Sequence, residues 1–178
     1  MTPVARTADE LLLGEWACLG ILYSGPTHGF AIAARLKPDT EIGRIWSVSR
    51  PLTYRALDQL AARGFIEAVG EERGIAGGNR TIMAATRKGR AQFRKWLNTP
   101  VVHLRDLRSE LLLKLVLADA CGIDLSAMLQ RQRAHIATLA DALAAKARRE
   151  TPVDVVALWR AESSRAALRF IDRLAVES

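Results

Sequence analysis

Residues 49–97 read SRPLTYRALDQLAARGFIEAVGEERGIAGGNRTIMAATRKGRAQFRKWL, and this stretch decides the fold. Ser49 can cap a helix that carries Pro51 in its first turn, and apolar residues then recur at helical spacing, at Leu52, Ala56 and Leu60. Residues 65–69 and 81–85 predict two short strands on either side of a glycine-rich turn. A helix followed by a β-hairpin is typical of a winged helix-turn-helix domain, in which the helix can enter a DNA major groove.

Two further predicted helices precede this stretch. The first is indicated by apolar residues at helical spacing, at Leu12, Trp16, Leu19 and Tyr23. Thr27 can cap the second, which is expected over residues 28–36. The final helix of this N-terminal domain is expected to begin at Thr86 and to end before Thr99 and Pro100. We therefore expect a winged helix-turn-helix domain in residues 1–100, within a mainly α fold that includes a small β-hairpin.

Basic residues are concentrated in residues 73–95. This segment contains seven Lys and Arg residues and no acidic residue, so its charge equals the formal net charge of +7 of the whole chain. A localised excess of positive charge attracts a polyanion, and here it falls in the predicted hairpin and the helix after it. We therefore predict nucleic-acid binding. The alternative interpretation is that these residues only keep the surface soluble.

Eight residues of the predicted helix, hairpin and following helix are candidate DNA contacts. Arg50 lies at the end of the helix that enters a groove first, and Arg55 points away from the apolar face. Tyr54 offers a hydroxyl to a phosphate, and a half-buried place in the core is the alternative for its ring. Arg73 and Arg80 flank the glycine-rich turn, which we expect to be mobile. The candidates are Ser49, Arg50, Thr53, Tyr54, Arg55, Arg73, Arg80 and Lys88.

The composition is that of an ordinary globular protein. A chain of 178 residues can form one or two domains with a sizeable core, and 49% hydrophobic with 25% charged residues argues against disorder. No uninterrupted apolar segment approaches the ~20 residues of a membrane-spanning helix, and residues 1–10 do not resemble a signal peptide, so we expect a cytoplasmic protein. Cys18 and Cys121 fall in apolar helical patterns, which favours reduced, buried thiols over a disulfide or a metal site.

No sequence pattern indicates an enzyme. His28, His103 and His135 lie in different predicted elements and lack the spacing of metal ligands. The glycine-rich segment 74–78 is not followed by Gly-Lys-Ser/Thr and a helix, as a phosphate-binding loop would be. We therefore expect no catalytic residue, no cofactor and no metal site.

Residues 101–178 are predicted to be helical and to form a separate dimerisation region. The longest helix is expected over residues 124–149, and it repeats apolar residues at the spacing of a coiled-coil seam, at Leu129, Ile136, Leu139 and Leu143. Gln132 and Lys146 are polar positions of the same seam. The last helix carries apolar residues on one face, at Val155, Trp159, Ala166 and Phe170. These faces predict a homodimer, and packing of the last helix against the longest one is the alternative.

Several motifs in the first 120 residues resemble the PadR family of bacterial transcriptional regulators. The motifs are GPTHGFAI at 25–32, LTYRALDQL at 52–60, GFI at 64–66 and TRKG at 86–89, and RSELLLKL at 108–115 is weakly similar. The sequence departs from the family pattern at Phe30, where members usually have tyrosine. It also departs at Met83, where they usually have an aromatic residue.

The resemblance implies a winged-helix repressor that binds a pseudo-palindromic operator as a homodimer formed through its C-terminal helices. It also implies a small aromatic or cationic effector that releases the DNA, bound between the winged domain and those helices. Trp96, Trp159 and Phe170 could stack on such a molecule, and packing in the core is the alternative for each. The alternative function is a winged-helix module that binds another protein and no specific DNA.

Overall fold

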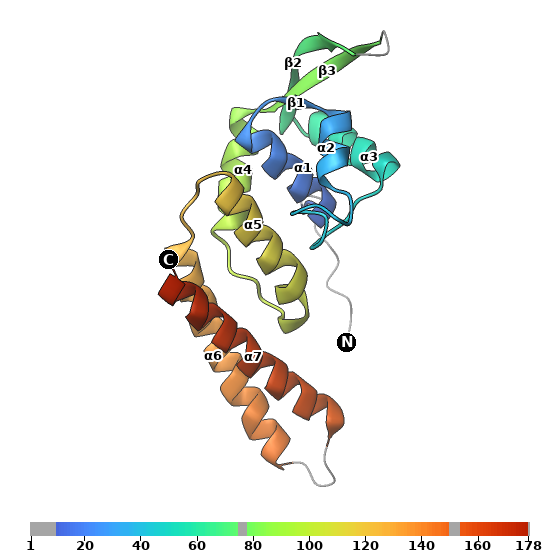
Figure 1. Ribbon diagram of the computed structural model, residues 1–178. Helices are drawn as coiled ribbons and strands as arrows, with labels where there is room; N and C mark the ends of the chain where they lie inside the picture. The colour runs from blue at the N-terminus through green and yellow to red at the C-terminus, as the bar shows by residue number, and fades with distance from the viewer. Residues whose placement is uncertain (1–9, 75–77, 150–153, 178) are drawn as a thin grey trace. The chain divides into compact units, whose positions relative to one another are not determined.

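The computed structural model describes residues 10–74, 78–149 and 154–177 (Figure 1). The chain separates into two compact units, Met1–Lys95 and Trp96–Ser178, and the division falls ahead of the boundary expected at residue 100. Within the described residues, helices dominate and the sheet is small and antiparallel. The predicted mainly α fold with a β-hairpin is therefore confirmed. No described helix combines the length and the apolar character needed to cross a bilayer.

The N-terminal unit is a winged helix-turn-helix. Its elements are α1 (Leu13–Ser24), β1 (Thr27–His28), α2 (Gly29–Arg35), α3 (Arg50–Ala62), β2 (Ile66–Arg73), β3 (Asn79–Ala85) and α4 (Arg87–Leu97). The strands are ordered β1-β3-β2, and each pair of neighbours is antiparallel. The hairpin of β2 and β3, called the wing below, projects from the helices (Figure 1). Strand β1 was not expected, because two residues are too few to produce an alternating pattern.

Helix α1 is the centre of the N-terminal core, since every residue from Glu15 to Tyr23 is buried. Cys18 lies in this helix, and burial raises the pKa of its thiol to about 12, which keeps it protonated and unreactive. Cys121 is half-buried, and both cysteines are free thiols. The expected burial is therefore confirmed for Cys18, whereas Cys121 is more exposed than expected.

Contacts around Thr86 fix the start of α4 against the corner between α3 and β2. Thr86 Oγ1 donates to the carbonyl of Gly64 at 2.7 Å and accepts from the N–H of Gly89 at 3.0 Å. A Cβ atom on Gly89 would lie 2.0 Å from the carbonyl oxygen of Phe65. Gly64 itself has a φ of +69°, which favours glycine after a helix. The TRKG motif and the glycine of GFI are thus explained by local packing.

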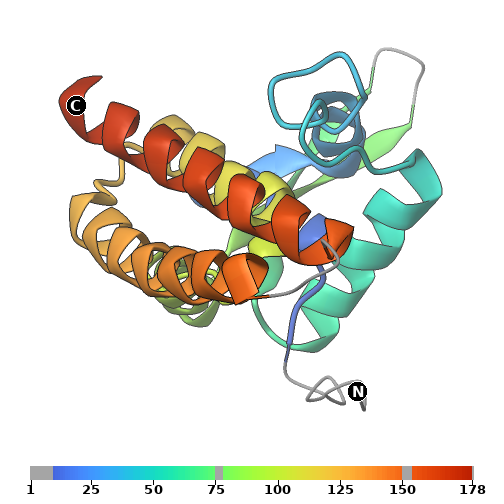
Figure 2. The same ribbon diagram turned by 90° about the horizontal axis from the view of Figure 1, so that it is seen from below.

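The regular elements in the described residues of the C-terminal unit are all helical. Its elements are the 3₁₀ turn η1 (Leu104–Asp106), the π-helical turn η2 (Leu107–Leu111) and the helices α5 (Leu112–Ala120), α6 (Ser126–Arg149) and α7 (Val155–Glu177). Helices α6 and α7 lie side by side and run antiparallel, as both views show (Figures 1 and 2). Arg133 on α6 donates to Asp172 on α7 at 2.5 Å.

The packing of α6 on α7 uses a different face of α7 from the predicted apolar one. On α7, the buried positions of the first three turns are small residues, Ala157, Ala161 and Ser164. On α6, Ile136 and Leu143 are buried in this arrangement. Val155 and Trp159, at the start of the predicted face, are 74% and 72% exposed. Small side chains let two helices approach closely, so the larger apolar residues of α7 remain outside.

Gln132 is a polar residue within the apolar pattern of α6, and its hydrogen bonds explain its presence there. Its side chain is fully buried, and its amide accepts from the N–H of Val101 at 2.6 Å and donates to the carbonyl of the same residue at 2.9 Å. Both ends of the amide are therefore satisfied inside the chain. The residue fastens the segment before η1 to α6.

Lys114 is a second buried polar group in the C-terminal unit. Its Nζ atom donates to the carbonyl of Thr99 at 2.5 Å, forms an ion pair with Glu110 at 2.8 Å and lies 5.0 Å from the ring centroid of Trp96. Burial lowers the pKa of Lys114 below its ordinary value of 10.5, while the hydrogen bond and the charge of Glu110 act in the opposite direction.

This lowered pKa predicts a pH-dependent contribution to stability. Between the lowered folded pKa and 10.5 the unfolded chain binds more protons than the folded chain, so the contribution of Lys114 to stability rises with pH. The difference in unfolding free energy between wild type and Lys114→Met is therefore expected to shift in favour of wild type as pH approaches 10.5, and then to level off. Denaturant unfolding at several pH values measures it. A difference that stays constant over this range would contradict the prediction.

Candidate nucleic-acid interface

The first two turns of α3 present polar and basic side chains to solvent. Ser49 is the N-cap residue, and its side chain makes no capping hydrogen bond. Arg50, Tyr54 and Arg55 are exposed, whereas the other face of the helix buries apolar residues, Ala56, Leu57 and Leu60. Helical spacing therefore separates the arginines from the core. A helix N-terminus beside two guanidinium groups favours negatively charged partners.

Tyr54 and Thr53, neighbours in α3, differ in exposure. The ring of Tyr54 is 41% exposed and packs over α2, where a Cβ atom on Gly29 would lie 2.8 Å from it. Both alternatives predicted for Tyr54 are thus compatible with its position. Thr53 is fully buried, and its Oγ1 donates to the carbonyl of Ser49 at 3.0 Å. Its side chain does not reach the surface and cannot contact a groove, because helical spacing places it beside the leucines.

The wing carries two of the predicted contacts. Arg73 is exposed at the end of β2 and pairs across the hairpin with Asn79. Arg80 is half-buried on β3, and its Nη1 atom lies 3.3 Å from Nε2 of His28. Residues 75–77 of the predicted mobile turn lie outside the described residues.

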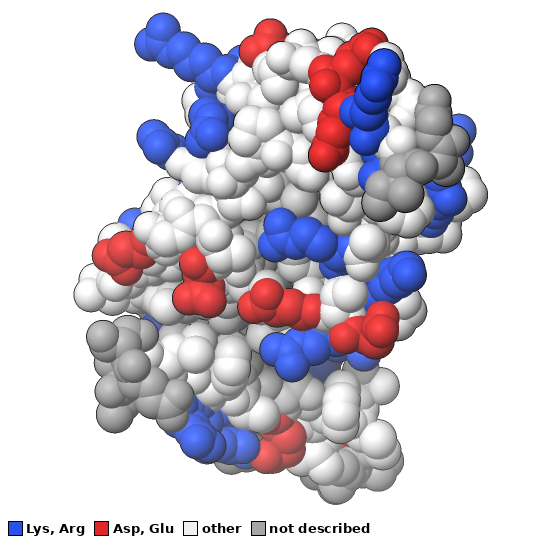
Figure 3. Space-filling view, turned by 45° about the horizontal axis from the view of Figure 1, so that its top comes forward, with Lys and Arg blue, Asp and Glu red and all other residues white. Residues whose placement is uncertain are grey.

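Acidic residues of β2 lie next to Arg80 and Asn79 at the start of β3. The antiparallel register places Glu72 opposite Arg80, and Glu71 accepts a hydrogen bond from the side-chain amide of Asn79 at 2.8 Å. The face in Figure 3 likewise shows groups of basic side chains interrupted by acidic ones. Of the basic residues in segment 73–95, Arg80 therefore has an acidic residue opposite it in the sheet, although no ion pair joins the two side chains.

Lys88 lies apart from the other candidate contacts. Its Nζ atom donates to the carbonyl of Arg63 at 2.8 Å and lies 4.9 Å from the ring centroid of Phe65, at the C-terminal end of α3. That end is about 18 Å of helix from Arg50. Two further basic residues of α4 cover the ring of Tyr23 on α1, with Cζ atoms 4.6 Å (Arg90) and 5.6 Å (Arg94) from its centroid. These three basic residues therefore pack against aromatic rings of the same unit.

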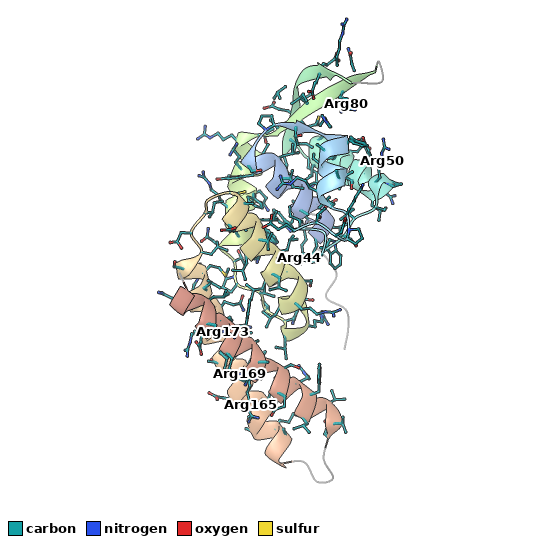
Figure 4. The ribbon with its side chains drawn as sticks, in the orientation of Figure 1. Arg44, Arg50, Arg80, Arg165, Arg169 and Arg173 are labelled. Carbon is teal, nitrogen blue, oxygen red and sulfur yellow. The ribbon has the colours of Figure 1, made fainter. Side chains whose placement is uncertain are left out.

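Phe30 was not among the predicted contacts, although it borders the N-terminal end of α3. Its ring is 49% exposed and lies near Arg50 and Arg80, both labelled in Figure 4. A shallow hollow of about 510 Å³ adjoins it, lined also by Lys37, Ser49 and Arg50. The sequence signal for Phe30 was a large aromatic residue within a short helix. Its partners come from distant segments and could not be inferred.

The three aromatic residues proposed to hold an effector lie in the C-terminal unit and differ in their surroundings. Trp96 is buried beside Lys114, Trp159 is largely exposed at the start of α7, and Phe170 is 38% exposed. Trp159 and Phe170 are eleven residues apart, which corresponds to about 16 Å of helix. Their two rings therefore cannot stack together on one small molecule. Within the described residues, no group of His, Cys, Asp and Glu has the arrangement of a metal site.

Comparison with known proteins gives a family and several similar structures. Residues 18–95 match the model of the transcriptional regulator PadR-like family. The chain is similar to Bacillus subtilis PadR in complex with operator DNA, with 17% identity over 90% of this chain and 96% of that one and a TM-score of 0.47. The chain is also similar to smu.1604c from Streptococcus mutans UA159, with 13% identity over 93% of this chain and 99% of that one and a TM-score of 0.45.

A third similar structure is the PadR-like transcriptional regulator BC1756 from Bacillus cereus, with 18% identity over 97% of this chain and 99% of that one and a TM-score of 0.42. No curated protein matches the chain. The family match spans residues from α1 to α4, and so includes the whole of α3 and the described part of the wing. Residues 18–95 of this chain therefore match the transcriptional regulator PadR-like family.

Proposed function

We propose that this transcriptional regulator binds duplex DNA sequence-specifically, with α3 in the major groove and the wing on the backbone. The proposed contacts are Ser49, Arg50, Tyr54, Arg55, Arg73 and Arg80. The observation that carries the proposal is the exposure of two arginines at the N-terminal end of α3, on the face opposite its buried residues. Thr53 is left out because it is buried, and Lys88 because it caps the far end of α3.

The active form is proposed to be a homodimer that binds a pseudo-palindromic operator. Support comes from the apolar residues at the start of α7, where Val155, Val156, Leu158 and Trp159 are all exposed. Exposed apolar patches of this kind are typical of interaction sites, and a two-fold dimer presents two copies of α3 to two half-sites. Leu129 and Leu139 on α6 are half-buried and can extend the same interface. Selection of bound fragments from the source genome would reveal whether the operator is two-fold symmetric.

Repression, release by a small molecule and a cytoplasmic location are further parts of the proposal. A dimer on an operator excludes other proteins from the same DNA, which makes repression the simplest outcome. For the aromatic or cationic effector, Trp159 is the strongest of the three aromatic candidates, because its ring is exposed. A ligand there would compete with or complete the proposed dimer interface.

The wing provides a direct test of DNA binding. Phosphate contacts release counterions, so replacing Arg73 and Arg80 by alanine should lower the slope of log affinity against log salt by about 0.9 for each phosphate that the protein no longer neutralises. The affinities for specific and random duplexes should fall by similar factors, because phosphate contacts carry no sequence information. Fluorescence anisotropy at several salt concentrations measures both. An unchanged slope would mean that the wing does not touch the backbone.

A winged-helix module that binds protein is the second candidate. It is favoured by four exposed apolar or aromatic side chains around α3 and the wing, at Phe30, Leu52, Tyr54 and Val69. A mostly apolar protein interface would respond little to salt, whereas DNA binding weakens log-linearly with salt concentration. The same titration with wild-type protein therefore separates the two candidates.

A further inference from the structure

Two arginines from different elements make cation–π contacts with the exposed ring of Phe30. The Cζ atom of Arg50, the first residue of α3, lies 5.3 Å from the ring centroid, and that of Arg80 on β3 lies 5.5 Å from it. Their separation cannot exceed the sum of these two distances. Arg50 also lies 5.8 Å from the ring of Tyr54. Two guanidinium groups are thus gathered where α2, α3 and the wing meet (Figure 4).

Neither arginine has an acidic partner among the described residues. Glu72 is opposite Arg80 in the sheet, but its carboxylate lies 3.8 Å from Nε2 of His28. Nδ1 of His28 accepts the N–H of Ala31 at 3.1 Å, so a neutral ring carries its proton on Nε2 and cannot accept there from Arg80. The N–H groups of Arg80 are therefore available to another acceptor.

Both guanidinium groups are positively charged and repel each other to an extent that depends on the salt concentration, whereas the ring attracts each of them. An exposed cation–π contact contributes about 0.5–1 kcal/mol, because the face of the ring carries partial negative charge. An anion between the two guanidinium groups would remove the repulsion. A phosphate fits this role, since planar guanidinium groups donate two parallel hydrogen bonds to phosphate oxygens.

We propose that Phe30 is a positioning residue that holds Arg50 and Arg80 as a clamp for a single phosphate group of the DNA backbone, at the junction of α3 and the wing. The inference rests on the proposed DNA binding, and it names a backbone phosphate as the group that Arg50 and Arg80 bind. Phe30 itself makes no ionic contact; it fixes two flexible side chains before the DNA arrives. Because the clamp joins α3 to the wing, it sets the angle between the groove-binding helix and the backbone contact.

The first test compares Phe30→Leu and Phe30→Tyr with wild type. Phe30→Leu removes the ring face and should weaken binding up to about thirtyfold for a selected duplex and a random duplex alike, since Arg80 then loses its contact with the Phe30 ring and Arg50 keeps only the ring of Tyr54. Phe30→Tyr keeps the ring and should bind like wild type. Leu12→Ala is the matched control, because it shortens an exposed apolar side chain of the same unit that belongs neither to α3 nor to the wing. Denaturant unfolding should show similar stability for all four proteins, since Phe30 is half exposed.

The second test is a double-mutant cycle of Phe30→Leu with Arg80→Ala. If the ring acts through Arg80, the double variant should bind nearly as well as the weaker single variant, instead of showing the product of the two single effects. Multiplicative effects, or a Phe30→Leu variant that binds like wild type, would overturn the clamp while leaving the proposed function intact. Wild-type protein that binds no duplex in a salt-dependent way would overturn both.

Discussion

Replacing Arg50 and Arg55 together by alanine is expected to abolish most specific DNA binding. A guanidinium that contacts a guanine edge contributes about 1–3 kcal/mol of discrimination, so removing two such groups would reduce the affinity for the selected duplex by roughly 30-fold to more than 10,000-fold. Both side chains are exposed on α3, so the variant should fold normally. Anisotropy titration with selected and random duplexes measures the reduction, which should be much larger for the selected one.

A matched variant separates this local effect from a change in net charge. Arg105→Ala, Arg108→Ala also removes two exposed arginines, but from η1 and η2 in the C-terminal unit. Its affinity for both duplexes should stay close to that of wild type. Equal reductions in the two double variants would show that binding depends on overall charge and that α3 is not the reading element.

Placing glutamate at Val155 and Trp159 is expected to convert the proposed dimer into monomers. Both side chains are more than two-thirds exposed in the single chain, so the substitutions should change its stability little. In a dimer they would place four like charges in an apolar interface, and tryptophan is a frequent binding hot spot. Affinity for a two-fold operator should then fall by roughly 10²- to 10⁴-fold, because the two DNA-binding units no longer act together. Light scattering and DNA titration measure the two effects.

Ile136 provides the contrasting position for this experiment. It is fully buried within the chain, so Ile136→Glu should lower the free energy of unfolding by an amount on the order of 3–5 kcal/mol, whatever the oligomeric state. Dissociation of the dimer after Ile136→Glu would therefore not identify an interface. Wild-type protein that is monomeric at micromolar concentration would contradict the dimer and the two-fold operator with it.

Sequence alone determined the order of the four helices and the two wing strands in the N-terminal unit, but not strand β1. Ser49 and Pro51 predicted the start of α3, where Ser49 occupies the N-cap position without a side-chain capping bond, and Gly64, whose φ is +69°, predicted its end. These are local signals, since caps and turns depend on residues a few positions apart. The motif around Thr86 was visible for the same reason. Its physical cause, the close packing of Gly89 against the backbone of Phe65, required the structure.

Tertiary structure alone decided which of several apolar faces became buried and which charges became neighbours. The last helix carries both large and small residues at helical spacing, and periodicity could not reveal that Ala157 and Ala161 pack inside while Trp159 stays outside. The small residues of α7 are buried because α6 and α7 pack closely along that face. In the same way, Arg50, Phe30 and Arg80 are separated by twenty residues or more along the chain, and only the packing of α2 between α3 and β3 brings them together. Local patterns carry no information about such contacts, because their energies arise between segments that the sequence keeps apart.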